Sequence, residues 1–155
     1  MNKKERLDYL FYKIGNQQSD FYLCGLFKIH GEIKATKWLK YSDICFPLNP
    51  WEDEKIDYIN QRQILPNEIV LDLEDKVRIN EIIKTLKEKK ALFYAYATGS
   101  KGYHIHIFFK KELTEKQKFK VIQHYGADIQ KASSKTMIAL ELVPHWKSGK
   151  IKELI

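Results

Sequence analysis

The second half of the chain carries a regular pattern of hydrophobic and polar positions. Four short runs rich in apolar, β-branched and aromatic residues are typical of strands: 68–74, 91–97, 103–109 and 136–143. Two longer segments repeat apolar residues every three to four positions, as amphipathic helices do: 75–90 and 114–126. The order strand, helix, strand, strand, helix, strand predicts an α+β fold, the ferredoxin-like or RRM-like βαββαβ unit.

This topology would fix the neighbours of each strand. Strands 68–74 and 103–109 would be central, and strand 136–143 would lie beside 68–74. Both helices would cover one face of the sheet and leave the other face open. The first helix would begin after Asp75 as its N-cap. Its buried side would carry five apolar residues: Val77, Ile79, Ile82, Ile83 and Leu86.

The first half of the chain is less regular. Its predicted elements are a short helix and two strands: 3–14, 21–29 and 32–41. Residues 42–67 contain three prolines and predict a long connection with one helical turn at 52–60. The last six residues predict a further short strand. A length of 155 residues fits one domain, with a variable N-terminal subdomain over 1–67 and the RRM-like subdomain over 68–155.

Charge and cysteine usage narrow the function classes. Lysine and arginine number 27 against 20 acidic residues, and the net charge of +7 favours an anionic partner such as nucleic acid. The two cysteines, Cys24 and Cys45, form no CxxC pair, which excludes a zinc ribbon and predicts no structural zinc. No apolar run reaches the roughly 18 residues of a membrane span. We therefore expect a soluble, cytoplasmic protein without a membrane partner.

Carboxylates stand on two of the predicted strands. Asp72 and Glu74 are two residues apart, so their side chains would point to the same face. Mutual repulsion and desolvation make such a pair costly, and a bound Mg²⁺ or Mn²⁺ would offset that cost. Glu141 could join them if its strand pairs with the first. The alternatives are that Glu74 and Asp75 only end the strand and cap the helix, and that Glu141 is a solvated edge residue.

A glycine-bounded turn, Gly99-Ser100-Lys101-Gly102, precedes the strand 103–109. Its backbone N–H groups, hydroxyl and ammonium suit a triphosphate, and its glycines permit positive φ and close approach to a ligand. His104 follows by two residues and could reach a phosphate oxygen. The same four residues also form ordinary hairpin connections, so the turn gains its meaning from the carboxylates predicted on the adjacent strands.

These three stretches resemble the motifs of the archaeo-eukaryotic primase superfamily. "IVLDLE" (69–74) is similar to its first motif, an apolar strand with acid-x-acid, and "TGSKGYHIHI" (98–107) to its Ser-x-Lys-Gly-x-His motif. "IALELVPHWKSGK" (138–150) resembles its third, an acid on an apolar strand followed by basic residues, although glutamate stands where aspartate is common. The resemblance covers about residues 68 to 150. It implies an RRM-like catalytic half and template-directed nucleotidyl transfer, as a DNA primase, a primer-extending polymerase or both.

The resemblance also implies roles for individual residues. Two divalent metals, Mg²⁺ or Mn²⁺, would be held by three catalytic carboxylates: Asp72, Glu74 and Glu141. The triphosphate of a dNTP or NTP would be held by the turn and its neighbours: Ser100, Lys101, Gly102, the catalytic His104 and Lys147. The partner would be a single-stranded DNA template or a primer-template. Because the chain is short for the family, a stand-alone enzyme, an excised domain and a subunit needing a partner or helicase all remain open.

Two other functions remain open from the residues alone. His104 and His106 form a histidine–bulky–histidine pair like that of HUH endonucleases, which nick single-stranded DNA; both histidines would then bind one metal and Tyr125 would be the nucleophile. A non-catalytic RRM-like module would instead stack RNA bases on exposed strand aromatics. The candidates for that platform are Tyr94, Tyr96 and Phe108.

Overall fold

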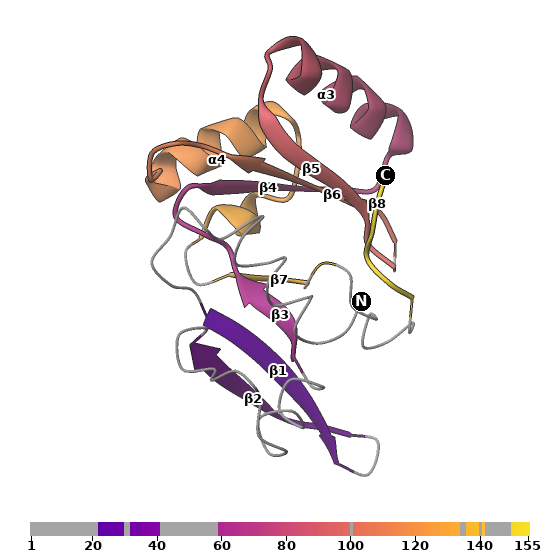
Figure 1. The fold of residues 1–155 in the computed structure, drawn as a ribbon, viewed down its shortest axis with the longest axis vertical. Coiled ribbons are helices and arrows are strands. Elements are labelled where there is room, and N and C mark those ends of the chain that lie inside the picture. Colours follow the sequence, from indigo (N-terminus) through magenta and orange to yellow (C-terminus); the bar gives the residue numbers. More distant parts are fainter. Residues whose placement is uncertain are drawn as a thin grey trace, which may run out of the picture.

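The computed structural model describes residues 22–29, 32–40, 59–99, 101–133, 136–139, 141 and 150–155, with side chains from residue 61 onward. The predicted helix over 3–14 lies outside the described residues, as do residues 42–58 of the predicted connection. The described elements form two antiparallel four-stranded sheets and two helices (Figure 1). The chain is therefore of the α+β class, as the sequence predicts.

The first sheet has the strand order β2-β1-β3-β7. Its strands are β1 (Tyr22–Ile29), β2 (Glu32–Lys40), β3 (Ile59–Gln63) and β7 (Met137–Ala139). The strands β1 and β2 confirm the two predicted near the N-terminus, within one residue at each end. β3 was not predicted, because its sequence INQRQ has neither alternation nor strong β propensity. It is paired on both sides, with β1 and with β7.

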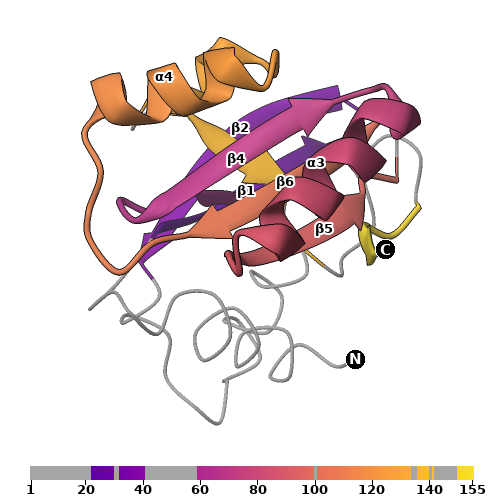
Figure 2. The same ribbon diagram turned by 90° about the horizontal axis from the view of Figure 1, so that it is seen from above.

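The second sheet has the strand order β4-β6-β5-β8. Its strands are β4 (Glu68–Leu73), β6 (Tyr103–Phe108), β5 (Leu92–Ala97) and β8 (Glu153–Leu154), all close to predicted positions. Helices α3 (Lys76–Glu88) and α4 (Glu115–His124) cover one face of this sheet, and the first sheet lies on the other side (Figures 1 and 2). The order of layers is therefore helices, second sheet, first sheet.

This arrangement corrects two features of the predicted βαββαβ unit. The strand predicted beside 68–74 is β7, but it pairs with β3 in the first sheet, so β4 lies at an edge. The outer side of β4 is taken up by the 3₁₀ helix η3 (Ile129–Ala132) and the residues before it, where the Asp128 N–H donates to the carbonyl of Asp72. The predicted open face is also covered in its middle, where Val70, Tyr96 and His106 are fully buried.

Local sequence explains both helices. The Asp75 carboxylate accepts from the Val77 N–H as the predicted N-cap of α3, and Thr114 forms a capping box with Gln117 at the start of α4. Odd-numbered strand residues and one side of each helix form the main core, which includes Leu71, Ile105 and these helix residues: Ile79, Ile82, Leu86 and Ile122. Val77 is 66% exposed, which corrects its predicted burial; its neighbours Lys76 and Arg78 in the first turn of α3 are exposed as well.

Candidate active site

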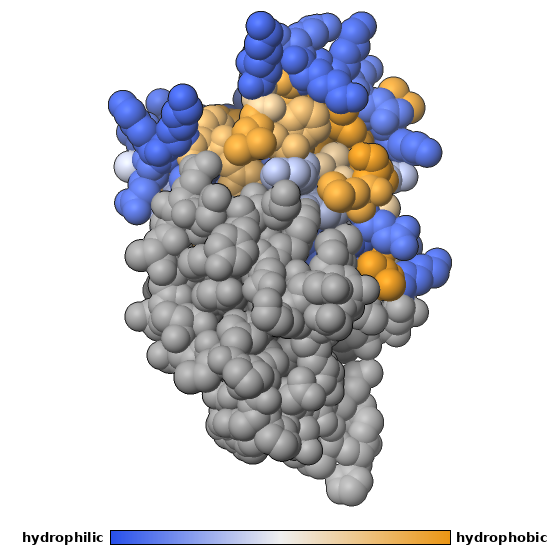
Figure 3. Space-filling model, in the orientation of Figure 1, coloured by the Kyte–Doolittle hydropathy of each residue, from blue (hydrophilic) through white to orange (hydrophobic). Residues whose placement is uncertain are grey.

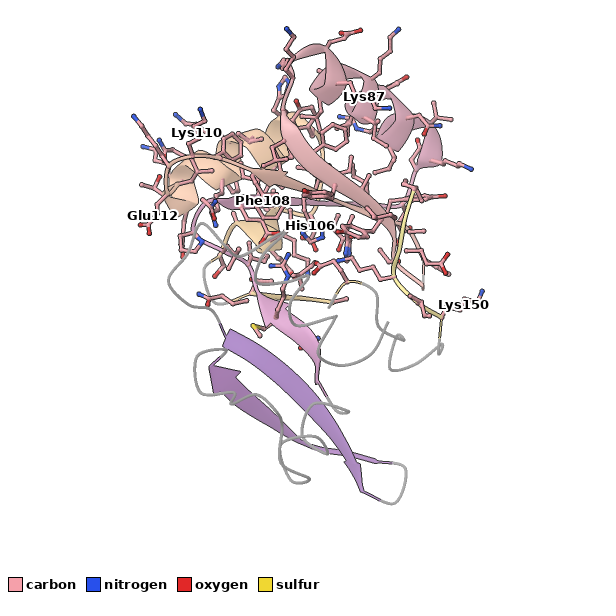
Figure 4. All side chains as sticks on the ribbon, viewed as in Figure 1. Lys87, His106, Phe108, Lys110, Glu112 and Lys150 are labelled. Carbon is pink, nitrogen blue, oxygen red and sulfur yellow. The ribbon has the colours of Figure 1, made fainter. Side chains whose placement is uncertain are left out.

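Even-numbered residues of β4 and β6 form one polar face of the second sheet. The antiparallel register places Asp72 opposite His104, and Val70 opposite His106. Because side chains alternate along a strand, both histidines lie on the side away from the helices. Figure 4 shows His106 on the side of β6 that faces β3 and β7. The polar groups of the site therefore lie between the two sheets.

A closed ring of buried polar side chains joins these layers, which we call the ion ring. Its members come from five parts of the chain and are each at most 1% exposed: Arg62, Glu68, His106, Glu141 and Lys152. The Arg62 guanidinium donates two bonds to Glu68, at 2.8 and 2.7 Å, and two to Glu141, at 3.0 and 3.1 Å. Its remaining N–H donates to the carbonyl of Gln63, so all five donors are used.

His106 completes the ring between two opposite charges. Its Nδ1 lies 2.7 Å from a Glu68 carboxylate oxygen, and its Nε2 lies 3.0 Å from Nζ of Lys152. A carboxylate accepts and an ammonium donates, so Nδ1 carries the proton and Nε2 is the acceptor. Lys152 also donates to the Ala139 carbonyl at 2.9 Å and lies 3.4 Å from Glu141. With neutral His106, the two carboxylates and two cations leave the ring with no net charge.

The electrostatics of the ring agree with these charges. Burial alone would raise the pKa of Glu141, but Arg62 and then Lys152 outweigh it and lower the pKa to about 2. Burial likewise opposes the charge of Glu68, whose pKa Arg62 holds well below its usual range. Burial lowers the pKa of Lys152 to about 8, against the pull of Glu141. Burial, followed by the charge of Lys152, lowers the pKa of His106 and keeps it neutral.

The second polar pair lies at the end of the same face, where it meets solvent. Nε2 of His104 is 3.5 Å from Oδ1 of Asp72, whose side chain is 29% exposed. Burial and then the charge of Lys152 lower the pKa of His104 to about 4, so the imidazole is neutral near pH 7. Burial opposes ionisation of Asp72, yet the His104 contact and the charges of Lys131 and Lys152 lower its pKa. Asp72 is thus a partly exposed, stable carboxylate.

One atom of this pair lacks a partner. Nδ1 of His104 is buried, and no described residue makes a hydrogen bond with it. Since Nε2 faces the Asp72 carboxylate, Nε2 holds the proton and Nδ1 is a bare acceptor. Buried polar atoms without a partner are rare and costly, so this atom is the position in the described site where a ligand donor would be most favourable.

The glycine turn lies against this end of β4. Gly99 and Gly102 have φ of +72° and +97°, as the prediction of positive φ requires. However, the space where each glycine lacks a Cβ is filled by backbone atoms and is not free for a ligand. A Cβ on Gly99 would lie 2.4 Å from the Lys150 carbonyl oxygen, and one on Gly102 would lie 2.6 Å from that of Leu73. The glycines allow the turn to pack between the end of β4 and the C-terminal segment.

The predicted site residues divide into three groups. Asp72 and His104 are in contact, and exposed Glu74 lies beside Gly102, whose added Cβ would be 3.3 Å from Glu74 Cγ. Lys101 is exposed in the same turn. Glu141 belongs instead to the ion ring. Ser100 and Lys147 lie outside the described residues.

A shallow hollow opens beside the turn. Its volume is about 580 Å³, and it is lined by strand and turn residues on one side and by the C-terminal segment on the other, including Thr98, Tyr103, Lys150 and Glu153. The Thr98 hydroxyl lies 3.2 Å from the carbonyl oxygens of Lys101 and Gly102, which stabilises the turn that forms its wall. The hollow therefore has a rigid wall close to Lys101.

A divalent metal such as Mg²⁺ needs oxygen ligands, which carboxylates can supply. Among the described residues, no three or more histidine, cysteine or acidic side chains are placed to hold a metal ion together. Both oxygens of Glu141 already accept from Arg62. Asp72 and Glu74 stay the predicted ligands, because Mg²⁺ is commonly held by one or two carboxylates together with substrate phosphates and waters. The prediction of Glu141 as a third ligand stays a prediction.

The geometry argues against both alternative functions. Both nitrogens of His106 contact ring partners, so it has no lone pair to share a metal with His104. Tyr125 packs against the core on the helix side of the sheet, away from the histidines. The RNA-stacking module needs several exposed aromatics, but Tyr96 is 0% and Phe108 is 7% exposed, so that Tyr94 alone of the three candidates is partly accessible.

Three cations of the site carried no sequence signal. Arg62 lies in an unpatterned strand, Lys131 follows the start of a short 3₁₀ helix, and Lys152 is one of many lysines near the end of the chain. Each acquires its role from residues far away in sequence. Glu68 could have been identified from the sequence. It lies four residues before Asp72 on the same strand, and side chains at such a spacing point to the same face.

Comparisons with known proteins were made at three levels. No protein-family model matches the chain, and no curated protein matches it in sequence. Among solved structures, it resembles the polymerase domain of Mycobacterium tuberculosis Ligase D in complex with DNA, with a TM-score of 0.57 and 8% identity. The match covers 99% of this chain and 80% of that one. In the described part of the chain, no helix is long and apolar enough to span a membrane. The chain thus shares its fold with that polymerase domain.

Proposed function

We propose that this chain is a template-directed nucleotidyltransferase, a DNA primase or primer-extending polymerase. The observation that carries the proposal is the Asp72–His104 pair, which meets solvent at the end of β4 and β6 in a fold shared with a polymerase domain. The similar structure holds DNA, and the net charge of +7 favours the same class of partner.

Asp72 and Glu74 would hold divalent metal together with the phosphates of the incoming nucleotide, and Glu141 would serve as a further ligand only by leaving the ring. When bound, the metal would activate the primer 3′-hydroxyl and stabilise the leaving pyrophosphate. His104 orients the Asp72 carboxylate through Nε2. Its Nδ1 can accept from a hydroxyl, whereas a phosphate oxygen would bind there only after the imidazole takes up a proton. Lys101 and Lys147 would contribute positive charge to the triphosphate, and the Ser100 hydroxyl would donate a hydrogen bond to it.

The test is nucleotide incorporation on a defined template. Purified protein is given end-labelled single-stranded DNA, with and without an annealed primer, Mg²⁺ or Mn²⁺, and dNTPs or NTPs. We expect products whose sequence follows the template. Primer dependence would distinguish extension from initiation. A nicked template with protein attached, or no product with any metal and nucleotide, would overturn the proposal.

Matched variants assign the reaction to the site. Asp72→Asn and His104→Gln should fold and lose product, because they change the pair while keeping its size. Glu81→Gln removes an exposed acid on α3, away from the site, and should extend at the wild-type rate. Equal loss in Glu81→Gln would show that charge alone, rather than this pair, is responsible.

A further inference from the structure

Five lysines gather at the end of the second sheet that lies opposite the Asp72–His104 pair. They stand in two short segments, 87–90 and 110–112, which together hold only two acids. The five are exposed, and among the described residues none makes a side-chain ion pair or hydrogen bond: Lys87, Lys89, Lys90, Lys110 and Lys111. We call this group the lysine rim.

The register of the sheet places the two segments side by side. Leu92 at the start of β5 pairs with Phe108 at the end of β6, so the residues before one and after the other leave the sheet at the same end. Figure 4 shows Lys87 and Lys110 on the two sides of this end. Figure 3 shows hydrophilic projections at both places with an apolar band between them. The rim therefore borders an apolar surface.

Both segments are held rigidly by the backbone. Phe109 and Asn67 exchange two hydrogen bonds of 2.9 Å, which fix the chain just before Lys110. The N–H groups of Lys90 and Ala91 donate to carbonyls of the last turn of α3. These bonds fix the backbone positions of the lysines before any partner binds, so only the side chains have to be ordered on binding an anion.

Lys90 occupies a position where lysine is unfavourable. Its φ is +54°, and it is the one described residue other than glycine with positive φ. Glycine is the usual residue just after a helix in this conformation, because a Cβ is strained there. The conformational cost of a lysine at this exposed corner motivates the hypothesis that its charge serves binding.

One apolar and one aromatic side chain of β5 supply the second part of a nucleic-acid surface. Leu92 is 48% exposed, and Tyr94, two residues further on the same face, is half-buried. The Tyr94 ring meets Phe108 edge-on, with centroids 6.0 Å apart, which fixes its plane. Stacking surfaces bordered by lysines are how proteins hold single strands without sequence preference.

We propose that the lysine rim and Tyr94 form a second contact for single-stranded nucleic acid, outside the reaction site. The strand β5 separates it from the turn by about 17 Å, at about 3.4 Å per residue. The inference adds a strand-binding surface to the proposed function. It is tested by binding alone, without metal or nucleotide, so a failure of the chemistry and a failure of this contact are distinguishable.

The experiment titrates a fluorescein-labelled oligothymidine of about 12 nucleotides at several salt concentrations. Lys90→Gly with Lys110→Gln should weaken binding about five-fold per lysine at 0.1 M salt and flatten the salt slope by about 0.7 for each. Lys84→Gln with Lys120→Gln removes equal charge from exposed positions within α3 and α4 and should bind like the wild type. Tyr94→Leu should weaken binding while leaving the salt slope unchanged.

Lys90→Gly separates binding from folding. Because it relieves the positive φ, its melting temperature should equal or exceed that of the wild type while its affinity falls. The proposal is overturned if the rim variant keeps the wild-type affinity and slope, or if the control pair loses as much. Equal or tighter binding of a polyglutamate peptide would also overturn it, because the surface would then suit an acidic protein.

Discussion

Lys152 places its ammonium 3.0 Å from Nε2 of His106, in an interior from which water is excluded. This contact joins the C-terminal segment to the middle of β6. It gives His106 a structural role and leaves His104 as the histidine of the candidate site. It also extends to that site, because the charge of Lys152 helps to keep His104 neutral and Asp72 ionised.

Removing the Lys152 charge should destabilise the protein strongly. Lys152→Met leaves two buried carboxylates with only Arg62 as a cation, and breaking a buried ion pair in this way costs about 3–5 kcal/mol. Urea unfolding followed by circular dichroism measures the loss. Lys150→Met, at an exposed side chain two residues away, should cost less than about 1 kcal/mol.

The same ring allows a rescue. Glu141→Gln combined with Lys152→Met restores charge balance and should recover part of the loss, so the two substitutions are not additive. If the double variant is as unstable as the sum of the single changes, Lys152 and Glu141 do not interact as described.

His106 should be a neutral imidazole with its proton on Nδ1. Glu68 accepts from that nitrogen and Lys152 donates to the other, so the opposite tautomer would lose both bonds. Nitrogen-15 NMR of labelled histidine at pH 7 distinguishes the tautomers. A proton on Nε2 of His106 would contradict the assignment. So would a His106 signal that Mn²⁺ broadens as strongly as it broadens the His104 signal.

Alanine at the turn glycines should be more costly than at a third glycine of similar φ. Gly99→Ala and Gly102→Ala would place a methyl group against backbone carbonyls, at 2.4 and 2.6 Å, whereas Gly126→Ala meets only the flexible Arg78 side chain at 3.3 Å. All three have positive φ, so strain of about 1 kcal/mol is common to them. The extra loss, measured by thermal unfolding, should appear at Gly99 and Gly102 alone.

Stability should fall as the solution is acidified, in two steps. The pKa of His104 is about 4 in the fold against 6.5 ordinarily, so between these values only the unfolded chain is protonated. Its contribution is therefore lost as pH falls from 6.5 to about 4. Glu141, at about 2 against 4.5, holds its contribution above pH 4.5 and loses it toward pH 2.

A His104 variant isolates the first step. His104→Gln should flatten the decline in the free energy of unfolding between pH 6.5 and 4, by at most about 1.4 kcal/mol per pH unit. Urea unfolding at pH 7, 5.5 and 4.5 measures it. An unchanged slope would mean that His104 is protonated in the folded protein.

Local signals were sufficient for most of the described elements. Asp75 and Thr114 marked the starts of α3 and α4, and period-two runs located β4, β5 and β6. Their pairing placed Asp72 beside His104, as expected for adjacent strands. These features depend on neighbours within a few residues or on one strand pairing.

The position of β7 could not be predicted in the same way. Its placement beside β3 depends on Arg62, 79 residues from Glu141, which neutralises that buried carboxylate. Neither strand alone shows this pairing, because INQRQ has no pattern and the run 136–143 is equally apolar in either sheet. For the same reason Lys152 gave no signal, since its burial is set by residues on three other elements.

The most direct test of the account is single-turnover extension of a primed DNA template by the wild type and by Asp72→Asn. We expect the wild type to add nucleotides in the presence of Mg²⁺ or Mn²⁺. Asp72→Asn should bind the primer-template equally well and extend it at least about 100-fold more slowly. If the wild type extends the primer and Asp72→Asn extends it at the same rate, the reaction takes place elsewhere in the protein. If the wild type does not extend the primer at all, the proposed function itself is contradicted.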